Sequence, residues 1–333
     1  MDILKYDLDN TVYIPSFFKD DFNGKNICFL DIETTGLSSK YNEVILIGAL
    51  CLEDNRVHIT QFFAENTNEE LELLTVFECF LNKFEYIITY NGASFDLPFL
   101  KKRFAHYNIN HSIDLISHLD LLKLVRKNKK LLKLENCKLK TVERFLNIYR
   151  EDTISGRESV SLYKDYEYTK DSYKKEIILK HNYDDIFYLP KLLSIYDIIE
   201  RETIMKLNVN FKGFSSVLTM NKPDIMFKDN LMYIEGITSL IDLPSQAYYK
   251  DHYSLNWDTS KCYFRIEINY KTGGLSGGER CSYIDLSESE LNMLGFDKLN
   301  YNTPDHILLL KIDEDVLYKN ISMIIDYIIS HLD

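Results

Sequence analysis

Long apolar runs are missing from this sequence, and no stretch reaches the length that spans a membrane. The N-terminus, MDILKYDLDN, carries acids where a secretory signal needs a basic start followed by an apolar core. The six cysteines are scattered singly and form no CxxC pair, which argues against a structural zinc site or a disulfide framework. Single cysteines also fit a reducing compartment. We therefore expect a cytoplasmic protein without a membrane partner.

Positive charge is scarce: Lys and Arg number 39 against 51 Asp and Glu, which gives a net charge of −12. A uniformly acidic surface repels phosphate, so binding of nucleic acid requires a local basic surface or bridging metal ions. Residues 123–140 offer one such surface, with eight Lys or Arg against the single acid Glu135. A solvated helix face explains the same residues equally well, and the sequence leaves both interpretations open.

The length of 333 residues exceeds what one average core needs, and 45% of the residues are hydrophobic, which is typical of a folded chain. Short apolar runs alternate with helical apolar spacing as far as about residue 200, whereas alternating aromatic-rich runs follow. We predict an N-terminal extension over 1–24, an α/β domain with a mixed sheet over 25–202, and a smaller β-rich (α+β) domain closed by one helix over 203–333.

The α/β domain is expected to alternate strands and helices. The predicted strands are 26–30, 44–52, 57–63 and 86–90. The predicted helices are 69–83, 95–107, 119–130, 138–148 and 172–200. Pro190 lies within the last of these and should kink or split it, because proline removes one backbone hydrogen bond.

Two carboxylates follow the first predicted strand, at Asp31 and Glu33. Residues i and i+2 of a strand point to the same side, so these two side chains project together. Neighbouring carboxylates repel each other unless a cation lies between them, and hard oxygen ligands suit Mg²⁺ or Mn²⁺. The alternative is a pair of surface acids that opens a polar turn.

Three further residues are candidates for the same chemistry. Asp96 lies in the first turn of a predicted helix, where the helix dipole also favours an acid without any function. His181 and Asp185 are four residues apart and therefore share a helix face, as a general base beside a metal-binding acid would. A paired surface His and Asp is the alternative. Asp184, rotated by about 100°, is expected to face solvent.

These motifs, in this order, resemble the DnaQ-like DEDD exonucleases of the RNase H fold, and most closely the bacterial YprB-like group. The resemblance covers about residues 25–198 and does not extend to the predicted C-terminal domain. It rests on D-I-E-T-T-G at 31–36, Y-N-G-x-x-F-D-x-P-F-L at 90–100, H-N-x-x-D at 181–185, and the stretches 118–122, 134–143 and 156–158. It implies an RNase H-like mixed sheet flanked by helices.

The resemblance also implies roles for individual residues. Asp31, Glu33, Asp96 and Asp185 match four carboxylates that bind two divalent ions, Mg²⁺ or Mn²⁺. His181 matches the general base and stands four residues before Asp185, where one branch of these enzymes has Tyr and another has His five residues before.

Other residues are expected to meet the substrate or to order the site. Phe95 could stack on a base or fill the core, and Asn91 could serve only as a turn residue beside Gly92. Asp120 could orient the site or simply cap a helix. The full set of predicted substrate contacts is Thr34, Leu37, Asn91, Phe95, Arg126, Lys127, Lys129 and Lys130.

The sequence therefore predicts a metal-dependent 3′→5′ exonuclease that hydrolyses phosphodiester bonds at the 3′ end of a single strand. DNA is favoured slightly over RNA, because the resemblance implies a helicase or repair protein as partner. The alternative is a catalytically weak or inactive RNase H-fold module that binds nucleic acid or protein.

Overall fold

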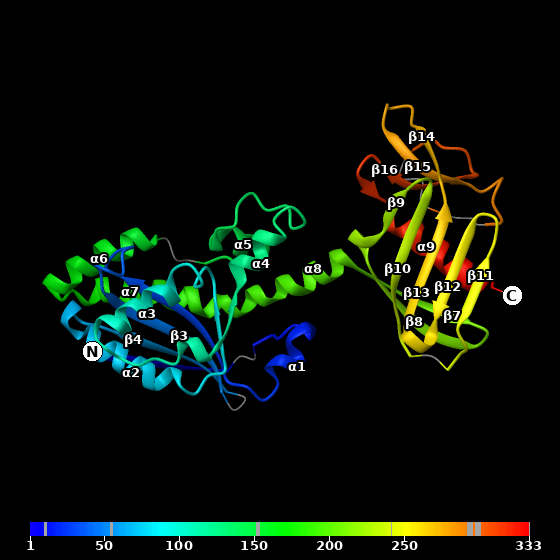
Figure 1. Ribbon diagram of the computed structural model, residues 1–333. Coiled ribbons are helices and arrows are strands. Elements are labelled where there is room, and N and C mark those ends of the chain that lie inside the picture. Colours follow the sequence, from blue (N-terminus) through cyan, green and yellow to red (C-terminus); the bar gives the residue numbers. More distant parts are fainter. Residues whose placement is uncertain are drawn as a thin grey trace. The chain divides into compact units, whose positions relative to one another are not determined.

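The computed structural model describes residues 1–9, 12–53, 56–150, 154–240, 242–291, 296 and 301–332. It divides into two compact units, Met1–Ile199 and Glu200–Asp333, and each is described by itself below (Figure 1). Among the described residues, no helix is long and apolar enough to cross a membrane.

A six-stranded mixed sheet forms the centre of the N-terminal unit, with the strand order β1-β4-β3-β2-β5-β6. Its strands are β1 (Asp2–Leu8), β2 (Ile27–Thr34), β3 (Val44–Glu53), β4 (Arg56–Phe63), β5 (Tyr86–Thr89) and β6 (Ser117–Asp120). The first four positions of that order pair antiparallel, whereas β2, β5 and β6 run parallel. The predicted mixed sheet is confirmed. The carboxyl ends of β2, β5 and β6 consequently meet at one end of the sheet.

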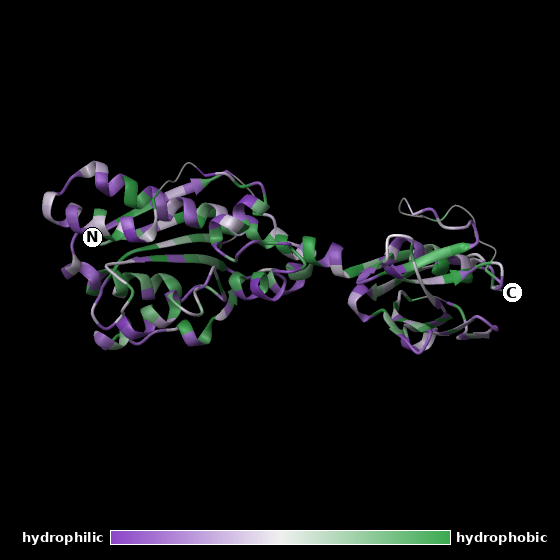
Figure 2. Ribbon diagram, turned by 90° about the horizontal axis from the view of Figure 1, so that it is seen from above, coloured by the Kyte–Doolittle hydropathy of each residue, from purple (hydrophilic) through white to green (hydrophobic). Residues whose placement is uncertain are grey.

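Helices cover both faces of this sheet. They are α1 (Lys19–Phe22), α2 (Glu70–Leu81), α3 (Asp96–His106), α4 (Leu121–Lys127), α5 (Leu139–Phe145), α6 (Gly156–Thr169), α7 (Ser172–Tyr188) and the beginning of α8 (Ile195–Thr203). The hydropathy colouring shows why: the strands are largely hydrophobic, whereas the helices are hydrophobic on part of their surface only (Figure 2).

Alternation along β2 assigns its residues to the two faces. Cys28, Leu30 and Ile32 belong to a core with α2 and α3. Ile27 and Phe29 belong to a second core that contains Ile186 of α7. Because side chains alternate along a strand, Asp31 and Glu33 continue the second series and face α7.

Two predictions for the N-terminal unit were wrong in detail. No strand was predicted for residues 2–8, but they form β1, which pairs with β4 from Asp2 opposite Phe63 to Leu8 opposite Val57. The helix predicted over 119–130 is α4 alone, since residues 117–120 form β6 beside β5. The break predicted at Pro190 is present: α7 ends at Tyr188, and a 3₁₀ segment, Leu189–Ser194, precedes α8.

In its described residues, the C-terminal unit is rich in antiparallel strands and contains one long helix, α9 (Tyr318–Ser330), as predicted. One sheet has the order β11-β12-β13-β10-β8-β7, with β9 paired to β10, and a second has the order β14-β15-β16-β17. The strands are β7 (Ile204–Phe211), β8 (Phe214–Asn221), β9 (Met226–Lys228), β10 (Leu231–Thr238), β11 (Gln246–Tyr249), β12 (Tyr253–Asp258), β13 (Tyr263–Asn269), β14 (Lys271–Gly274), β15 (Arg280–Asp285), β16 (Ile307–Ile312) and β17 (Asp315–Val316). Trp257, Phe264 and Ile324 are fully buried in the core that joins the larger sheet to α9.

Candidate active site

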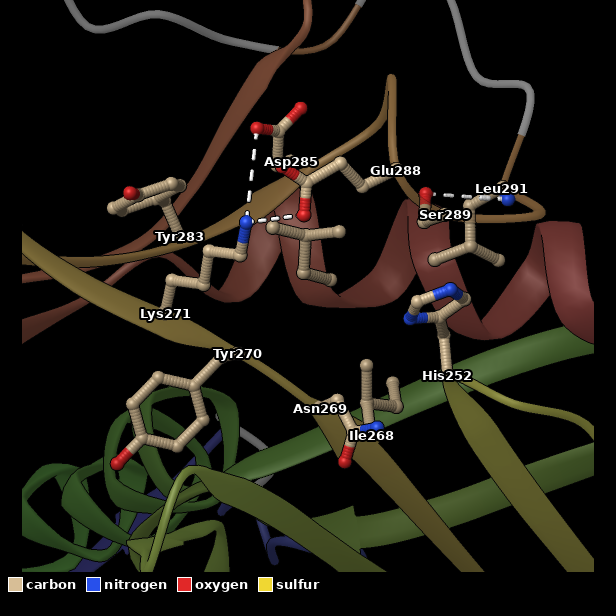
Figure 3. Close-up of a pocket in the computed structure, with 11 residues that line it drawn as sticks. His252, Ile268, Asn269, Tyr270, Lys271, Tyr283, Asp285, Glu288, Ser289 and Leu291 are labelled. Carbon is tan, nitrogen blue, oxygen red and sulfur yellow. Dashed lines mark hydrogen bonds and ion pairs between the residues drawn. The ribbon is translucent and has the colours of Figure 1, made fainter.

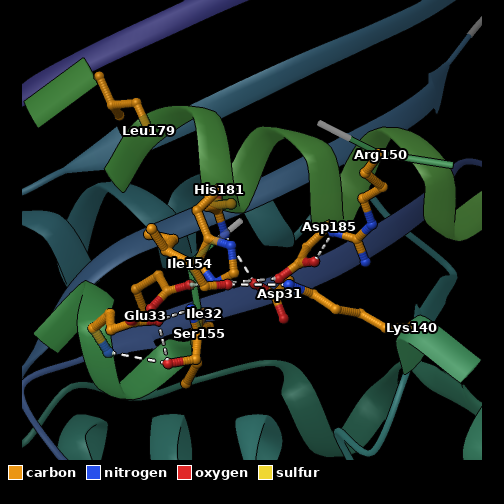
Figure 4. A network of polar contacts seen from close by, with 12 residues as sticks. Asp31, Ile32, Glu33, Lys140, Arg150, Ile154, Ser155, Leu179, His181 and Asp185 are labelled. Atoms are coloured by element: carbon orange, nitrogen blue, oxygen red, sulfur yellow. Dashed lines mark hydrogen bonds and ion pairs between the residues drawn. The ribbon is translucent and has the colours of Figure 1, made fainter. Parts of the chain in front are cut away.

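Side chains from β2 and α7 converge at the end of the sheet where β2 terminates (Figure 4). Nε2 of His181 lies 3.5 Å from Oε1 of Glu33 and 3.9 Å from Oδ2 of Asp185. One ligand atom from each of Glu33, His181 and Asp185 lies within 4.8 Å of the others. His181 and Glu33 are buried, while Asp185 is partly exposed. The helical i, i+4 spacing and the strand alternation thus bring the predicted base and two predicted carboxylates together.

Asp31 is held by α7 through a side-chain amide. Nδ2 of Asn182 donates a hydrogen bond of 2.9 Å to Oδ2 of Asp31. Oδ1 of Asn182 accepts a hydrogen bond of 2.9 Å from Nε2 of Gln61, which orients the amide. Gly48 of β3 stands opposite Asp31, and a Cβ there would overlap both Ile186 and Asn182. The glycine therefore permits the close approach of α7 to the sheet.

Asp96 joins the same end of the sheet from α3. Its Oδ1 accepts a hydrogen bond of 3.2 Å from the backbone N–H of Ile32, which lies between Asp31 and Glu33. Asp96 is almost fully buried, and it lies in the first turn of α3 as predicted.

Asp120 orders the loop that leads to Asp96. Its carboxylate accepts backbone hydrogen bonds of 2.8 Å from Asn91 and 3.1 Å from Ala93, and one of 3.0 Å from Leu122 at the start of α4. Both interpretations of Asp120 therefore hold at once: it caps a helix and it fixes the chain before α3. Asn91 has a φ of 74°, a left-handed conformation that asparagine tolerates.

The carboxylates strongly affect one another. The pKa of Asp31 lies well above its ordinary value because of burial and then the charges of Asp185, Asp96 and Glu33, while the hydrogen bond from Asn182 opposes the shift. Burial is also the main cause that raises the pKa of Glu33 to about 7 and that of Asp96 to about 7. Acids crowded in this way repel each other unless cations neutralise them.

The residues fit a divalent cation. Carboxylate oxygens are hard ligands that divalent cations accept, and the raised pKa values of Asp31, Glu33 and Asp96 mean that positive charge would stabilise their ionised forms.

Arg150 is a functional candidate that the sequence did not reveal. Its guanidinium is only 4% exposed and forms ion pairs with Asp185 and with Glu143 of α5. Nε of Arg150 donates a hydrogen bond of 2.9 Å to Oε2 of Glu143. Against the effect of burial, the charges of Asp185 and Glu143 raise the pKa of Arg150. Asp185 stands 35 positions away along the chain, so no local pattern could have indicated the pair.

The predicted substrate contacts surround this centre in different ways. Oγ1 of the buried Thr34 donates a hydrogen bond of 2.8 Å to the carbonyl of Gly36 and so stabilises the turn after β2. Leu37 follows with 89% of its surface exposed. Phe95 is half-buried, packs beside Phe99 with ring centroids 5.6 Å apart, and borders the core.

The four predicted basic contacts are exposed, but they do not share one helix face. Arg126 and Lys127 end α4, whereas Lys129 and Lys130 follow it in turns. Exposure at the surface is a requirement for contact with phosphate, so the basic interpretation stays available.

The expectation that Asp184 faces solvent was wrong. Its surface is only 3% exposed, and Nζ of Lys180 lies 2.6 Å from Oδ1 of Asp184. The reason is that α7 is covered on more than one side, since α6 packs against it in addition to the sheet.

The C-terminal unit has a small pocket of about 70 Å³ (Figure 3). Its polar groups largely satisfy one another: Lys271 forms ion pairs with Asp285 and Glu288. We assign no chemistry to this pocket.

The fold and the site together define a mixed α/β domain with a carboxylate centre at the end of its β2 strand. The family model described as the RNase_H superfamily matches residues 28–196, about half of the chain. The chain belongs to the RNase_H superfamily.

Comparisons with solved structures give distant similarities. The chain is 18% identical to the family B DNA polymerase from the hyperthermophilic archaeon Pyrobaculum calidifontis, with a TM-score of 0.40, over 52% of this chain and 24% of that chain. It is 13% identical to the zinc-bound E. coli ExoI in complex with single-stranded DNA, with a TM-score of 0.34, over 63% of this chain and 54% of that chain. The chain thus spans about a quarter and about half of these two proteins. No curated protein matches it.

Proposed function

We propose that this protein is a metal-dependent 3′→5′ exonuclease of the DnaQ-like DEDD type, close to the bacterial YprB-like group. It would hydrolyse phosphodiester bonds at the 3′ end of a single strand, with DNA favoured over RNA. The observation that carries this proposal is the convergence of Glu33, His181 and Asp185 within 4.8 Å, beside the partly buried Asp31 and the buried Asp96.

Asp31, Glu33, Asp96 and Asp185 would hold two divalent ions, Mg²⁺ or Mn²⁺. Such ions, when bound, stabilise the negative charge that develops on a phosphate and favour the ionisation of water. His181 would accept the proton of the attacking water, and its position 3.5 Å from Glu33 and 3.9 Å from Asp185 supports that role.

Substrate binding would use the surface around this centre. The exposed Leu37 and the half-buried Phe95 would contact the terminal nucleotide together with Thr34 and Asn91. The exposed basic residues would follow the phosphate backbone. They are Arg126, Lys127, Lys129 and Lys130.

The assignment of functions to the two parts of the chain is also a proposal. We assign catalysis to residues 25–202 together with strand β1, which belongs to the same sheet. Residues 203–333 have no assigned role. A cytoplasmic location is inferred from the scattered single cysteines, and a helicase or repair protein as partner is inferred from the family resemblance.

End-labelled oligonucleotides test the proposal. Matched DNA and RNA strands, single and double, with either end blocked, are incubated with Mn²⁺, Mg²⁺ or EDTA. We expect stepwise loss of mononucleotides from a free 3′ end, none with EDTA, and protection by a 3′ block. Internal cleavage, degradation from the 5′ end or metal-independent hydrolysis would contradict the proposal.

One observation favours the alternative of a binding module without catalysis. The guanidinium of Arg150 pairs with Asp185, and a cation that stayed there would compete with a metal ion. Binding of a single strand without hydrolysis in Mn²⁺ or Mg²⁺ would establish this alternative.

A further inference from the structure

The buried guanidinium of Arg150 contacts the carboxylate centre on the side of α5. Arg150 divides its guanidinium between two acids: Nε and Nη2 bind the two oxygens of Glu143, and Nη1 binds Oδ1 of Asp185. The planar guanidinium suits such a two-sided arrangement, because its N–H groups point in fixed directions. The geometry therefore gives Arg150 a bidentate anchor at one edge and a single contact at the other.

The two acids differ in how open they are. The side chain of Glu143 is 2% exposed and that of Asp185 is 16% exposed, while Arg150 is 4% exposed. Asp185 also contributes a ligand atom to the group formed with Glu33 and His181. Among the residues that the structure describes, Glu143 belongs to no such group. Glu143 is thus the more enclosed partner of Arg150, and Asp185 is the acid that both Arg150 and a divalent ion would contact.

The positive charges of a divalent ion and of Arg150 would repel each other. A divalent ion at Glu33 and Asp185 would stand close to the guanidinium, and like charges repel strongly where water is sparse. Release of Asp185 would leave Nη1 facing the centre with an unused N–H. A phosphate oxygen is the acceptor that best matches a guanidinium N–H.

We propose that Arg150 is an exchangeable cation of this centre: it holds Asp185 before metal binds and transfers its Nη1 edge to a phosphate oxygen of the nucleic acid afterwards. Glu143 keeps the guanidinium in place in both states. This inference rests on the proposed function for its substrate, and it makes Arg150 a residue that contacts substrate.

A purely structural ion pair is the competing explanation, since Arg150 connects α5 to α7. The two explanations predict opposite signs for Arg150→Gln, with Glu143→Gln as the reference variant. If the pair merely orders the helices, both Arg150→Gln and Glu143→Gln should weaken metal binding. If Arg150 competes with metal, Arg150→Gln should tighten metal binding, whereas Glu143→Gln should weaken it, because Arg150 then pairs with Asp185 alone.

The first experiment is calorimetric titration of Mn²⁺ into the full chain and its variants. We expect Arg150→Gln to bind Mn²⁺ roughly ten-fold more tightly and Glu143→Gln to bind it less tightly than wild type. Arg201→Gln is the matched control, because Arg201 is 75% exposed and pairs with Glu202 on the surface. Arg150→Lys retains the charge and should stay near wild type, which keeps the test valid if Arg150→Gln folds poorly. A loss of Mn²⁺ affinity in both Gln variants would overturn the proposal.

The second experiment measures the affinity of a single-stranded oligonucleotide in saturating Ca²⁺, without following hydrolysis. We expect Arg150→Gln to lose about ten-fold in affinity and Arg150→Lys to recover part of it. Unchanged affinity in Arg150→Gln would overturn the transfer to phosphate. An absence of hydrolysis by the wild-type chain in Mn²⁺ would instead contradict the proposed function, so the two failures remain distinguishable.

Discussion

Nδ2 of Asn182 donates a 2.9 Å hydrogen bond to Oδ2 of Asp31 and thereby joins α7 to β2 across 151 residues of sequence. The contact is close because β3 presents Gly48 opposite Asp31, where any Cβ would overlap Asn182 and Ile186. The amide of Asn182 is fixed in turn by Gln61 of β4. Three strands therefore cooperate to set the height of α7, which carries His181 and Asp185, above the carboxylates of β2.

Gly48→Ala should move α7, with His181 and Asp185, away from Asp31 and Glu33 of β2. The added methyl group forces Ile186 and Asn182 away from the sheet, at a cost of about 1–3 kcal/mol, as in other overpacked cores. We expect a lower melting temperature, and a larger loss of Mn²⁺ affinity than in a glycine variant far from the site. Gly274→Ala is the control, because a Cβ there meets only the carbonyl of Glu279 at 3.9 Å. Wild-type Mn²⁺ affinity in Gly48→Ala would show that the glycine does not position α7.

Asp31→Asn should abolish hydrolysis and leave the fold intact. The substitution preserves volume and removes a carboxylate whose pKa is raised well above its ordinary value by burial and by Asp185, Asp96 and Glu33. The melting temperature in EDTA should therefore hold or rise, while the increase caused by Mn²⁺ should shrink. Calorimetric unfolding with and without Mn²⁺ checks both effects. Strong destabilisation in EDTA, or hydrolysis close to wild type, would contradict the assignment.

The metal-free protein should lose stability as pH rises between about 4.5 and 7. Burial raises the pKa of Glu33 to about 7 from its ordinary 4.5, so in this window the folded state binds more protons than the unfolded state. Asp96, whose pKa burial raises to about 7, acts in the same direction. The free energy of unfolding in EDTA should therefore decline through the window.

Saturating Mn²⁺ should weaken or reverse this dependence, because the ion binds the ionised carboxylates. Denaturant titrations across the pH range measure both curves. The double variant Glu33→Gln and Asp96→Asn should flatten the decline in EDTA, and an equally steep decline in that variant would refute the explanation.

Local patterns predicted the elements that carry the site. Alternation placed Asp31 and Glu33 on one side of a strand, and helical spacing placed His181 with Asp185, because both relations depend only on neighbouring positions. The mixed sheet and the β-rich C-terminal unit followed from the periods of their apolar residues.

Relations between distant segments escaped prediction. The β1 strand has to find Phe63 and its neighbours, and nothing within residues 2–8 specifies that partner. The role of Arg150 depends on its contacts with Glu143 and Asp185, which lie on two different helices. Gly48 likewise lies within a strand, and the need for glycine there arises only from the packing of α7 against it. These residues determine the geometry of the centre through packing that no short motif encodes.

The basic segment predicts a salt-dependent phenotype. Replacing the exposed residues Arg126, Lys127, Lys129 and Lys130 with Gln should weaken binding to a single strand. The slope of log affinity against log salt concentration should decrease by about 0.7 for each phosphate contact that is lost. Gln at the exposed lysines 206, 212, 228 and 250 of the C-terminal unit is the charge-matched control. Equal slopes in the wild type and the quadruple variant would return the segment to the solvated-surface interpretation.

His181→Ala distinguishes two roles that its position allows. If the imidazole accepts a proton from the attacking water, turnover at saturating Mn²⁺ should fall by roughly 10²–10⁴-fold, the usual contribution of a positioned base. Mn²⁺ affinity should survive, because the four carboxylates remain. If Nε2 is instead a metal ligand beside Glu33 and Asp185, as its distances of 3.5 and 3.9 Å also permit, Mn²⁺ affinity should collapse together with turnover. His106→Ala, at an exposed histidine of α3, controls for the substitution itself. Turnover at saturating Mn²⁺ and calorimetric Mn²⁺ affinity are measured on the same preparations, and near-normal turnover with a lowered melting temperature would reduce His181 to a packing residue.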